Sequence, residues 1–248
     1  MNRWEYLVRR LGSGVFVILG VLLVTFILSR VLPGDPASLY LGHRASAEKV
    51  EEVREELGLN DPMHVQFVGY VSSTLRGEFG YSFFTKRLII DDLKVRFPAT
   101  MELVILSMLV TLLVGIPVGV LGAAMRGNWF DKTSRIITIS GVSTPVFLLA
   151  LLMQLLFFLY LDWLPLSGRL SREVMINHPI ETITGFYLID AAISGNWIAW
   201  KDVLWHLVMP VITLAVYPIS LVVRMTRASM IDIISETYVE AARASGLS

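Results

Sequence analysis

The most informative absences in this chain are those of cysteine and of charge. None of its 248 residues is cysteine, which excludes disulfide bonds and thiolate chemistry but leaves the redox compartment open. Only 17% of the residues are charged, against about a quarter in soluble domains, and the formal net charge is zero. A neutral, charge-poor chain gives no sign of a nucleic-acid partner. With 54% hydrophobic residues and a mean hydropathy of +0.64, the composition indicates a membrane protein.

Catalytic motifs are missing as well. The sequence contains no H-E-x-x-H metalloprotease motif, no P-loop for ATP and no paired aspartates in its long apolar stretches. The ionisable side chain that lies clearly within such a stretch is His206, and we expect it to make a bundle or interface contact. We therefore predict no catalytic residue, no metal site and no bound cofactor. A transporter without charge at membrane depth must take its energy from another protein.

Four stretches without Asp, Glu, Lys or Arg are long enough to cross a bilayer, which takes about 20 helical residues. The first could be a cleaved signal peptide, but its 19 uncharged residues exceed a typical signal core and no A-x-A site follows. We therefore predict four membrane-spanning helices, the first of them uncleaved. They cover Leu11–Ser29, Leu103–Met125, Ile136–Leu161 and Val203–Val223.

The distribution of basic residues predicts the orientation. Short basic segments stay in the cytoplasm, and here they are residues 1–10, residues 126–135 and the segment after the fourth span. Both termini of the chain are therefore predicted to be cytoplasmic. The two long connections, residues 32–97 and 162–202, then face outward.

The first outward connection is patterned like a small helical subdomain. Ser46 is a predicted N-cap and Gly58 a predicted stop for one helix. Asp61 is predicted to cap a second helix, with Pro62 at its first position. A third amphipathic piece, LIIDDLKVRF, leads into the second span. The second outward connection is less regular.

Glycine and proline within the spans predict close contacts and bends. A G-x-x-x-G pair allows two helices to approach closely, and proline kinks a helix. Ordinary helix packing explains any one of these residues, whereas together they suit a bundle that bends around a path. They are Gly115, Pro117 and Gly119 in the second span, Pro145 in the third, and Pro210 and Pro218 in the fourth.

The stretch after the fourth span predicts a short cytoplasmic helix. Thr237 and Glu240 have capping-box spacing, and Gly246 is a suitable C′ residue. Ala241 and Ala242 have short side chains and give the helix a narrow cross-section, while Tyr238 offers apolar contact. A helix this short is not stable alone in water, so it needs a partner to pack against.

Glu240, Ala241, Ala242 and Gly246 form an E-A-A-x-x-x-G pattern that resembles the EAA loop of ABC-importer permeases. The LPGDP turn at Leu32–Pro36 resembles the dipeptide/oligopeptide/nickel permease family, in particular the first of its two permease subunits. The segments ELGLNDPMHVQFVGYV, LRGEFGYSF, RFPATMEL, STPVF and HLVMPVITLA are similar to that family and come in its order. The resemblance covers essentially the whole chain.

The resemblance implies an all-α polytopic membrane protein with the type I ABC-importer permease fold. In the family the EAA pattern is followed by an I-x-x-x-L-P element and two more spans, so we expect a C-terminally truncated chain with four of six spans. The expected parts are residues 1–31, the cytoplasmic end and first span, residues 32–97, the extracytoplasmic helical segment, and residues 98–248, the permease core.

The implied function is that of a non-catalytic permease subunit in the prokaryotic inner membrane, importing di- or oligopeptides with ATP hydrolysed elsewhere. Implied partners are a second homologous permease, two cytoplasmic ABC ATPases, an extracytoplasmic binding protein and the bilayer. The EAA helix would dock on an ATPase and couple its motion to alternating access. Other cargo (nickel, glutathione, oligosaccharide) stays open. An ATPase-independent channel or secondary transporter, and a membrane enzyme, are the rival classes.

Overall fold

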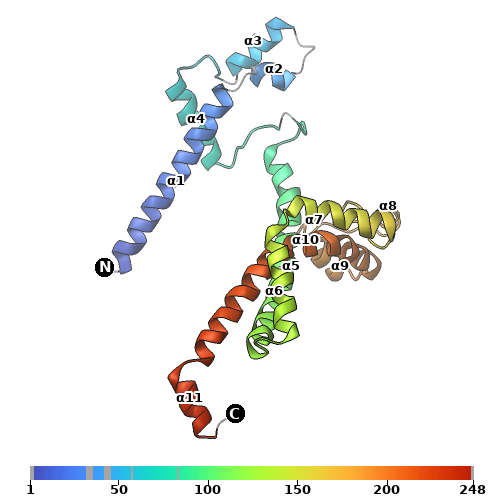
Figure 1. Cartoon of the computed structure of the whole chain (residues 1–248). Helices are drawn as coiled ribbons and strands as arrows, with labels where there is room; N and C mark the ends of the chain where they lie inside the picture. The colour runs from blue at the N-terminus through green and yellow to red at the C-terminus, as the bar shows by residue number, and fades with distance from the viewer. Residues whose placement is uncertain (1–2, 32–35, 42–45, 57, 83, 247–248) are drawn as a thin grey trace. The chain divides into compact units, whose positions relative to one another are not determined.

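The computed structural model describes residues 3–31, 36–41, 46–56, 58–82 and 84–246 (Figure 1). Within these ranges the regular structure is helical, and the only extended pairing is an isolated bridge between Tyr81 and Leu88. This confirms the predicted all-α class. The contacts divide the chain into two compact units, residues 1–94 and 95–248. Most of the LPGDP turn, residues 32–35, lies outside the described residues.

The first unit is built on one long apolar helix. Helix α1 (Arg3–Val31) contains the predicted first span in a single uninterrupted element. Near its end Phe26 is buried and contacts the rings of Phe67 and Tyr70, with centroids 5.4 and 5.9 Å away. Both rings belong to helix α4 (Met63–Leu75), which lies along α1 in Figure 1. Aromatic packing therefore fixes α4 to the last turns of α1.

The short helices of the first unit agree in part with the predicted caps. Helix α2 (Pro36–Leu41) precedes α3 (Ala47–Glu56), where the Ser46 hydroxyl accepts a hydrogen bond from the Lys49 amide at 3.4 Å. Gly58, after α3, has a left-handed φ of 61°, as predicted for a stop. The predicted Asp61 cap is wrong. Pro62, predicted as the first helical residue, is instead the N-cap residue, and α4 has no side-chain cap; Asp61 lies one residue before the position from which it would cap the helix.

The second unit is organised around two helices longer than a bilayer requires. Helix α5 (Ile89–Ala124) has 36 residues and contains the predicted second span except for Met125, its last residue. Helix α10 (Trp197–Ile234) has 38 residues and contains the whole predicted fourth span. The amphipathic piece expected before the second span is the beginning of α5 rather than a separate helix, because the helix continues through Pro98.

The predicted third span is broken. Helix α6 (Trp129–Ser143) is followed by α7 (Val146–Met153) and the π-helix η1 (Gln154–Tyr160), and the two halves are bent by 106°. The break falls at Pro145, which has no amide to donate and holds Thr144 in extended conformation at ψ 121°. The described residues thus contain three continuous helices able to span a membrane, and a fourth span if the bent pair counts as one.

The connection expected to be less regular, residues 162–202, folds against the N-terminal half of α10. Helix α8 (Arg172–Asn177) is capped by the Ser171 hydroxyl, and α10 by the Asn196 side chain, which accepts from the Ala199 amide at 3.1 Å. Between them lies α9 (Tyr187–Ile193), and α11 (Thr237–Ala244) follows the far end of α10 (Figure 1). The buried apolar cluster here consists of Leu170, Ala191, Ala199, Val203, Leu207 and Val211.

Candidate coupling site

The predicted cytoplasmic helix is present as α11. Its first residue is Thr237, whereas a helix capped by Thr237 would begin at Tyr238. After the helix, Gly246 has the left-handed conformation, with φ 82°. Tyr238 is 65% exposed, so its ring is available for contact with another protein. The side chains of Glu240 and Ala242 lie outside the described residues, so the capping box stays a prediction.

Helix α11 is attached to α10 by a tight turn. The Ser235 amide donates to the carbonyls of Ile231 and Asp232, both at 3.2 Å, and the Glu236 amide donates to Ile233 at 3.1 Å. Because these bonds close the end of α10 immediately before Thr237, α11 follows α10 after only two residues. A displacement of α11 is therefore applied first to the end of α10.

The glycine pair of α5 forms its contact with α10. A Cβ on Gly115 would lie 2.9 Å from Val222 Cγ1, and one on Gly119 would lie 2.7 Å from Thr226 Cβ and 2.9 Å from the Val223 carbonyl oxygen. The two helices therefore approach as closely as the G-x-x-x-G pattern predicts.

Helix α6 makes an equally close contact that the sequence did not single out. A Cβ on Gly141 would lie 2.5 Å from Ser220 Oγ of α10. Without a second glycine at i+4, Gly141 gives no such motif in the sequence. The three helices α5, α6 and α10 thus meet through small residues.

The predicted prolines have different positions. Pro117 is an exposed interior residue of α5, and Pro210 and Pro218 lie inside α10. Next to Pro210, the Ser107 hydroxyl of α5 donates to the Val211 carbonyl at 3.4 Å, which ties the two helices together. Of the four predicted prolines, only Pro145 lies at a helix boundary, between α6 and α7. A role of any of them in a transport path stays a prediction.

A buried ion pair joins the beginning of α6 to the C-terminal part of α10. Asp131 is 1% exposed, and its two carboxylate oxygens accept from Arg227 Nε at 2.6 Å and from Nη2 at 3.0 Å. The amide of Gly127 donates to Asp131 Oδ2 at 3.0 Å, and Arg135 Nε lies 3.8 Å from Oδ1. The sequence suggests at most an exposed i,i+4 pair between Asp131 and Arg135. The partner 96 residues away was missed.

A second buried carboxylate lies in the N-terminal half of α5. Glu102, 4% exposed, accepts from Arg169 Nη2 and from the Leu188 amide, both at 2.8 Å. Arg169 also donates to the Gly185 carbonyl and stacks over the Tyr187 ring at 3.6 Å. One carboxylate and one guanidinium therefore hold two parts of the connection before α10 against α5. No pattern in the sequence predicts this pair, because its two residues lie 67 positions apart.

Asp190 organises the same connection from within. Its carboxylate accepts from the backbone amides of Ile183, Thr184 and Gly185 and from the Thr184 hydroxyl. Burial favours the neutral acid, but these hydrogen bonds outweigh it and hold the pKa of Asp190 below its ordinary value. The charged carboxylate therefore serves as a structural centre for the loop before α9.

His206 makes the kind of contact that the sequence indicated. Its Nδ1 lies 2.8 Å from the Asp202 carbonyl, and the Asp202 carboxylate accepts from the Ser171 amide at 2.6 Å. The ring is thus part of the packing between α10 and the preceding connection. The described residues contain no group of three or more His, Asp or Glu side chains arranged to hold a metal ion.

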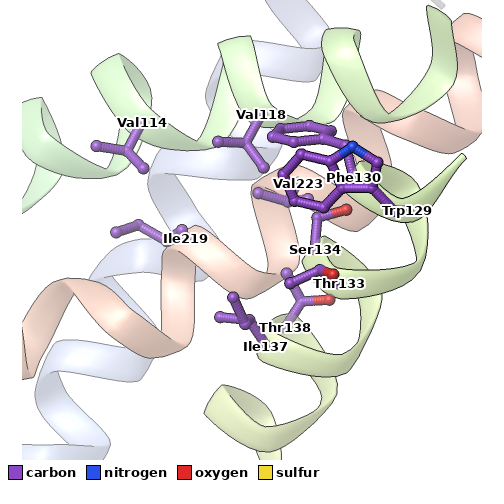
Figure 2. Close-up of a pocket in the computed structure, with 10 residues that line it drawn as sticks. All are labelled: Val114, Val118, Trp129, Phe130, Thr133, Ser134, Ile137, Thr138, Ile219 and Val223. Atoms are coloured by element: carbon purple, nitrogen blue, oxygen red, sulfur yellow. The ribbon is translucent and has the colours of Figure 1, made fainter. Parts of the chain in front are cut away.

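An apolar pocket of about 280 Å³ lies between α5, α6 and α10. Figure 2 shows Trp129 and Phe130 at the beginning of α6, with Val114 and Val118 of α5 and Val223 of α10. Seven of its ten lining residues are apolar and the other three carry hydroxyl groups, so it offers space for apolar groups rather than for a charged substrate. The remaining lining residues are Thr133, Ser134, Ile137, Thr138 and Ile219.

The chain is similar to known transport proteins along its length. Residues 3–104 match the model described as "Binding-prot-dependent transport system membrane comp, N-term", and residues 115–248 match "Binding-protein-dependent transport system inner membrane component". The probable D,D-dipeptide transport system permease protein DdpB of Escherichia coli K12 is 43% identical over 247 residues, which cover 100% of this chain and 72% of that protein.

Two further relatives extend the comparison. The dipeptide transport system permease protein DppB of Escherichia coli K12 is 36% identical over 98% of this chain and 72% of its own length. The glutathione transport system permease protein GsiC of Escherichia coli O1:K1 is 33% identical over 98% of this chain and 69% of its own length. These matches favour a permease over an enzyme. The chain, a multi-pass α-helical membrane protein, belongs to the binding-protein-dependent transport system inner membrane component family of ABC-transporter permeases.

Proposed function

We propose that the protein is the membrane-spanning subunit of an ATP-driven importer for di- or oligopeptides. The observation that carries the proposal is the 43% identity to a D,D-dipeptide permease over 100% of the chain, with dipeptide permeases among the other relatives. The identity of 33% to a glutathione permease keeps a glutathione-like tripeptide as the second cargo.

The proposed mechanism is alternating access driven from the cytoplasm. Two ATPase subunits close on ATP, and one of them receives α11 in a surface groove. An extracytoplasmic binding protein delivers substrate to the outer face, and a second homologous permease forms the other wall of the path. The short α11, its exposed Tyr238 and its position directly after α10 support this role. Neither ATP nor a cofactor is assigned to this chain.

Transport by the purified assembly tests the proposal. The full-length protein should co-purify with ATPase subunits, and the assembly in proteoliposomes should take up dipeptide with ATPase stimulated by the loaded binding protein. Co-purification without any ATPase subunit would contradict the proposal and favour a channel or secondary transporter. Uptake of glutathione but not of dipeptide would assign the second cargo.

A single substitution tests the coupling role of α11. Gly246 has φ 82°, where a β-branched residue is strained, so Gly246→Val should displace the end of α11 and reduce uptake with ATPase activity retained. The control is Gly195→Val, because Gly195 has a similar φ of 66° and equally open surroundings but lies between α9 and α10. If both variants reduce uptake equally, the effect is one of backbone strain and α11 has no special role.

The proposed orientation places the N-terminus and the α5–α6 connection in the cytoplasm. The 248 residues contain no cysteine, so a single introduced cysteine reports on its own side of the membrane. In right-side-out vesicles an impermeant maleimide should label Glu48→Cys and leave Lys132→Cys unlabelled until the vesicles are opened. The reverse pattern would invert the topology.

A further inference from the structure

The transmission of α11 motion into the rest of the second unit depends on where α10 is held. The last buried residue of α10 is Val223, and among the described residues those from 228 to 234 are exposed or half-buried. Arg227, about two helical turns before the end of α10 at Ile234, bonds to a side chain of α6. A displacement of the part of α10 beyond Arg227 is therefore transmitted to the contact between Arg227 and α6.

The contact between Arg227 and Asp131 restricts the orientation of both side chains. Arg227 binds Asp131 through two different nitrogens, at 2.6 and 3.0 Å, which fixes the orientation of both side chains. The same carboxylate also accepts, through Oδ2, from the amide of Gly127 in the loop between α5 and α6. Asp131 therefore connects three segments at one point, the end of α10, the beginning of α6 and the loop that leaves α5.

Helix α5 packs against this point on one side. Gly122 of α5 lies beside it, and a Cβ there would be 3.6 Å from both Arg227 Cδ and Ser134 Oγ. One turn earlier, Gly119 meets α10 at Thr226. Helices α5 and α10 are thus in direct contact on this side of the pair, so a displacement of α10 here is passed on to α5.

We propose that Asp131 is a positioning residue for energy coupling, which fixes α10 to α6 and the α5–α6 loop so that motion of α11 moves the three helices as one body. This inference rests on the proposed function of an ATP-driven permease. Asp131 touches neither ATP nor cargo and acts through Arg227. Without the pair, α11 and the end of α10 move on ATP closure while α5 and α6 follow incompletely.

The test measures uptake per ATP hydrolysed by the full-length protein in the assembled transporter, reconstituted in proteoliposomes. Asp131→Asn should lower this ratio about tenfold, with stimulated ATPase and the substrate concentration for half-maximal ATPase each within about twofold of wild type. Arg227→Lys keeps the charge but loses the two-nitrogen grip, so it should give an intermediate ratio. The exposed neighbour Lys132 supplies the matched control, and Lys132→Gln should leave the ratio unchanged.

A distance measurement separates positioning from stability. Spin labels on Tyr238→Cys and Ile139→Cys, both exposed, report the separation of α11 and α6. This distance should keep one narrow distribution through the ATP cycle in wild type and broaden when Asp131→Asn is added. A variant with an unchanged uptake ratio, or with uptake and ATPase reduced together in proportion to assembled complex, would overturn the inference.

Two further results complete the test. Should Asp131→Asn fail to assemble, Arg227→Lys decides, and a wild-type ratio for it overturns the inference. A wild-type protein without stimulated ATPase refutes the proposed importer function, whereas a normal wild-type assembly with a fully coupled Asp131→Asn refutes the positioning role alone.

Discussion

Adding one methyl group to three glycines of α5 should produce effects of different sign. Gly119 is the most constrained, because a Cβ there would lie 2.9 Å from the Val223 carbonyl oxygen as well as 2.7 Å from Thr226 Cβ. A backbone oxygen cannot rotate away, so α5 and α10 must separate. At Gly122 the nearest atoms are 3.6 Å away, which is ordinary van der Waals contact.

The expected magnitudes follow from two opposing terms. Replacing glycine by alanine inside a helix stabilises by up to about 1 kcal/mol, whereas overpacking costs about 1–3 kcal/mol. Gly119→Ala should therefore lower the free energy of unfolding by about 1–2 kcal/mol, and Gly122→Ala should leave it unchanged or raise it by up to about 1 kcal/mol. Gly115→Ala should fall between them, because its close neighbour is the Val222 side chain, stiff but not part of the backbone.

The assay is denaturant unfolding of the full-length protein in detergent, with the three variants compared under identical conditions. They differ from wild type by the same single methyl group in the same helix, so intrinsic helix preference cancels between them. If Gly119→Ala is as stable as Gly122→Ala, the close approach of α5 to α10 is not the constraint on this face. Uptake should follow the same order as stability.

Three further predictions concern Asp190, the pair Glu102–Arg169 and the helix break at Pro145. Asp190→Asn should weaken the loop before α9, which would be seen as faster hydrogen exchange at Thr184. Because folding lowers the pKa of Asp190, its contribution to stability is complete above the ordinary carboxyl pKa of about 3.9 and is lost as the pH falls through the lower pKa of the folded state. The Asn variant should not show this loss at low pH. Glu102→Gln should lower the free energy of unfolding by about 3 kcal/mol, the low end for breaking a buried ion pair, because the Arg169 side chain is 25% exposed. The double variant Glu102→Gln, Arg169→Gln should lose less stability than the sum of the two single variants. Pro145→Ala should let α6 and α7 straighten, which would lengthen the spin-label distance between them; an unchanged distance would mean that packing, not proline, sets the bend.

The elements that the sequence predicted well are those governed by local chemistry. Uncharged stretches of about 20 residues marked the apolar helices. Ser46 and Gly58 marked the limits of α3, because hydroxyl capping and left-handed glycine need only neighbouring residues. Asp61 failed as a cap because Pro62 displaced the helix start by one residue, a competition between two local signals. Proline at position 145 was recognised, but its result, a bend of 106°, was not.

The long-range contacts could not be read in this way. The sequence by itself determined the all-α membrane class, a short helix from Tyr238 to near Gly246, found as α11 at Thr237–Ala244, and, through ordered motifs, the family. Only the tertiary structure decided that Asp131 pairs with Arg227, Glu102 with Arg169, and Gly141 with Ser220. The physical reason is that capping and helix periodicity act within one or two turns, whereas a buried charge is satisfied by whichever segment the fold brings within hydrogen-bond distance.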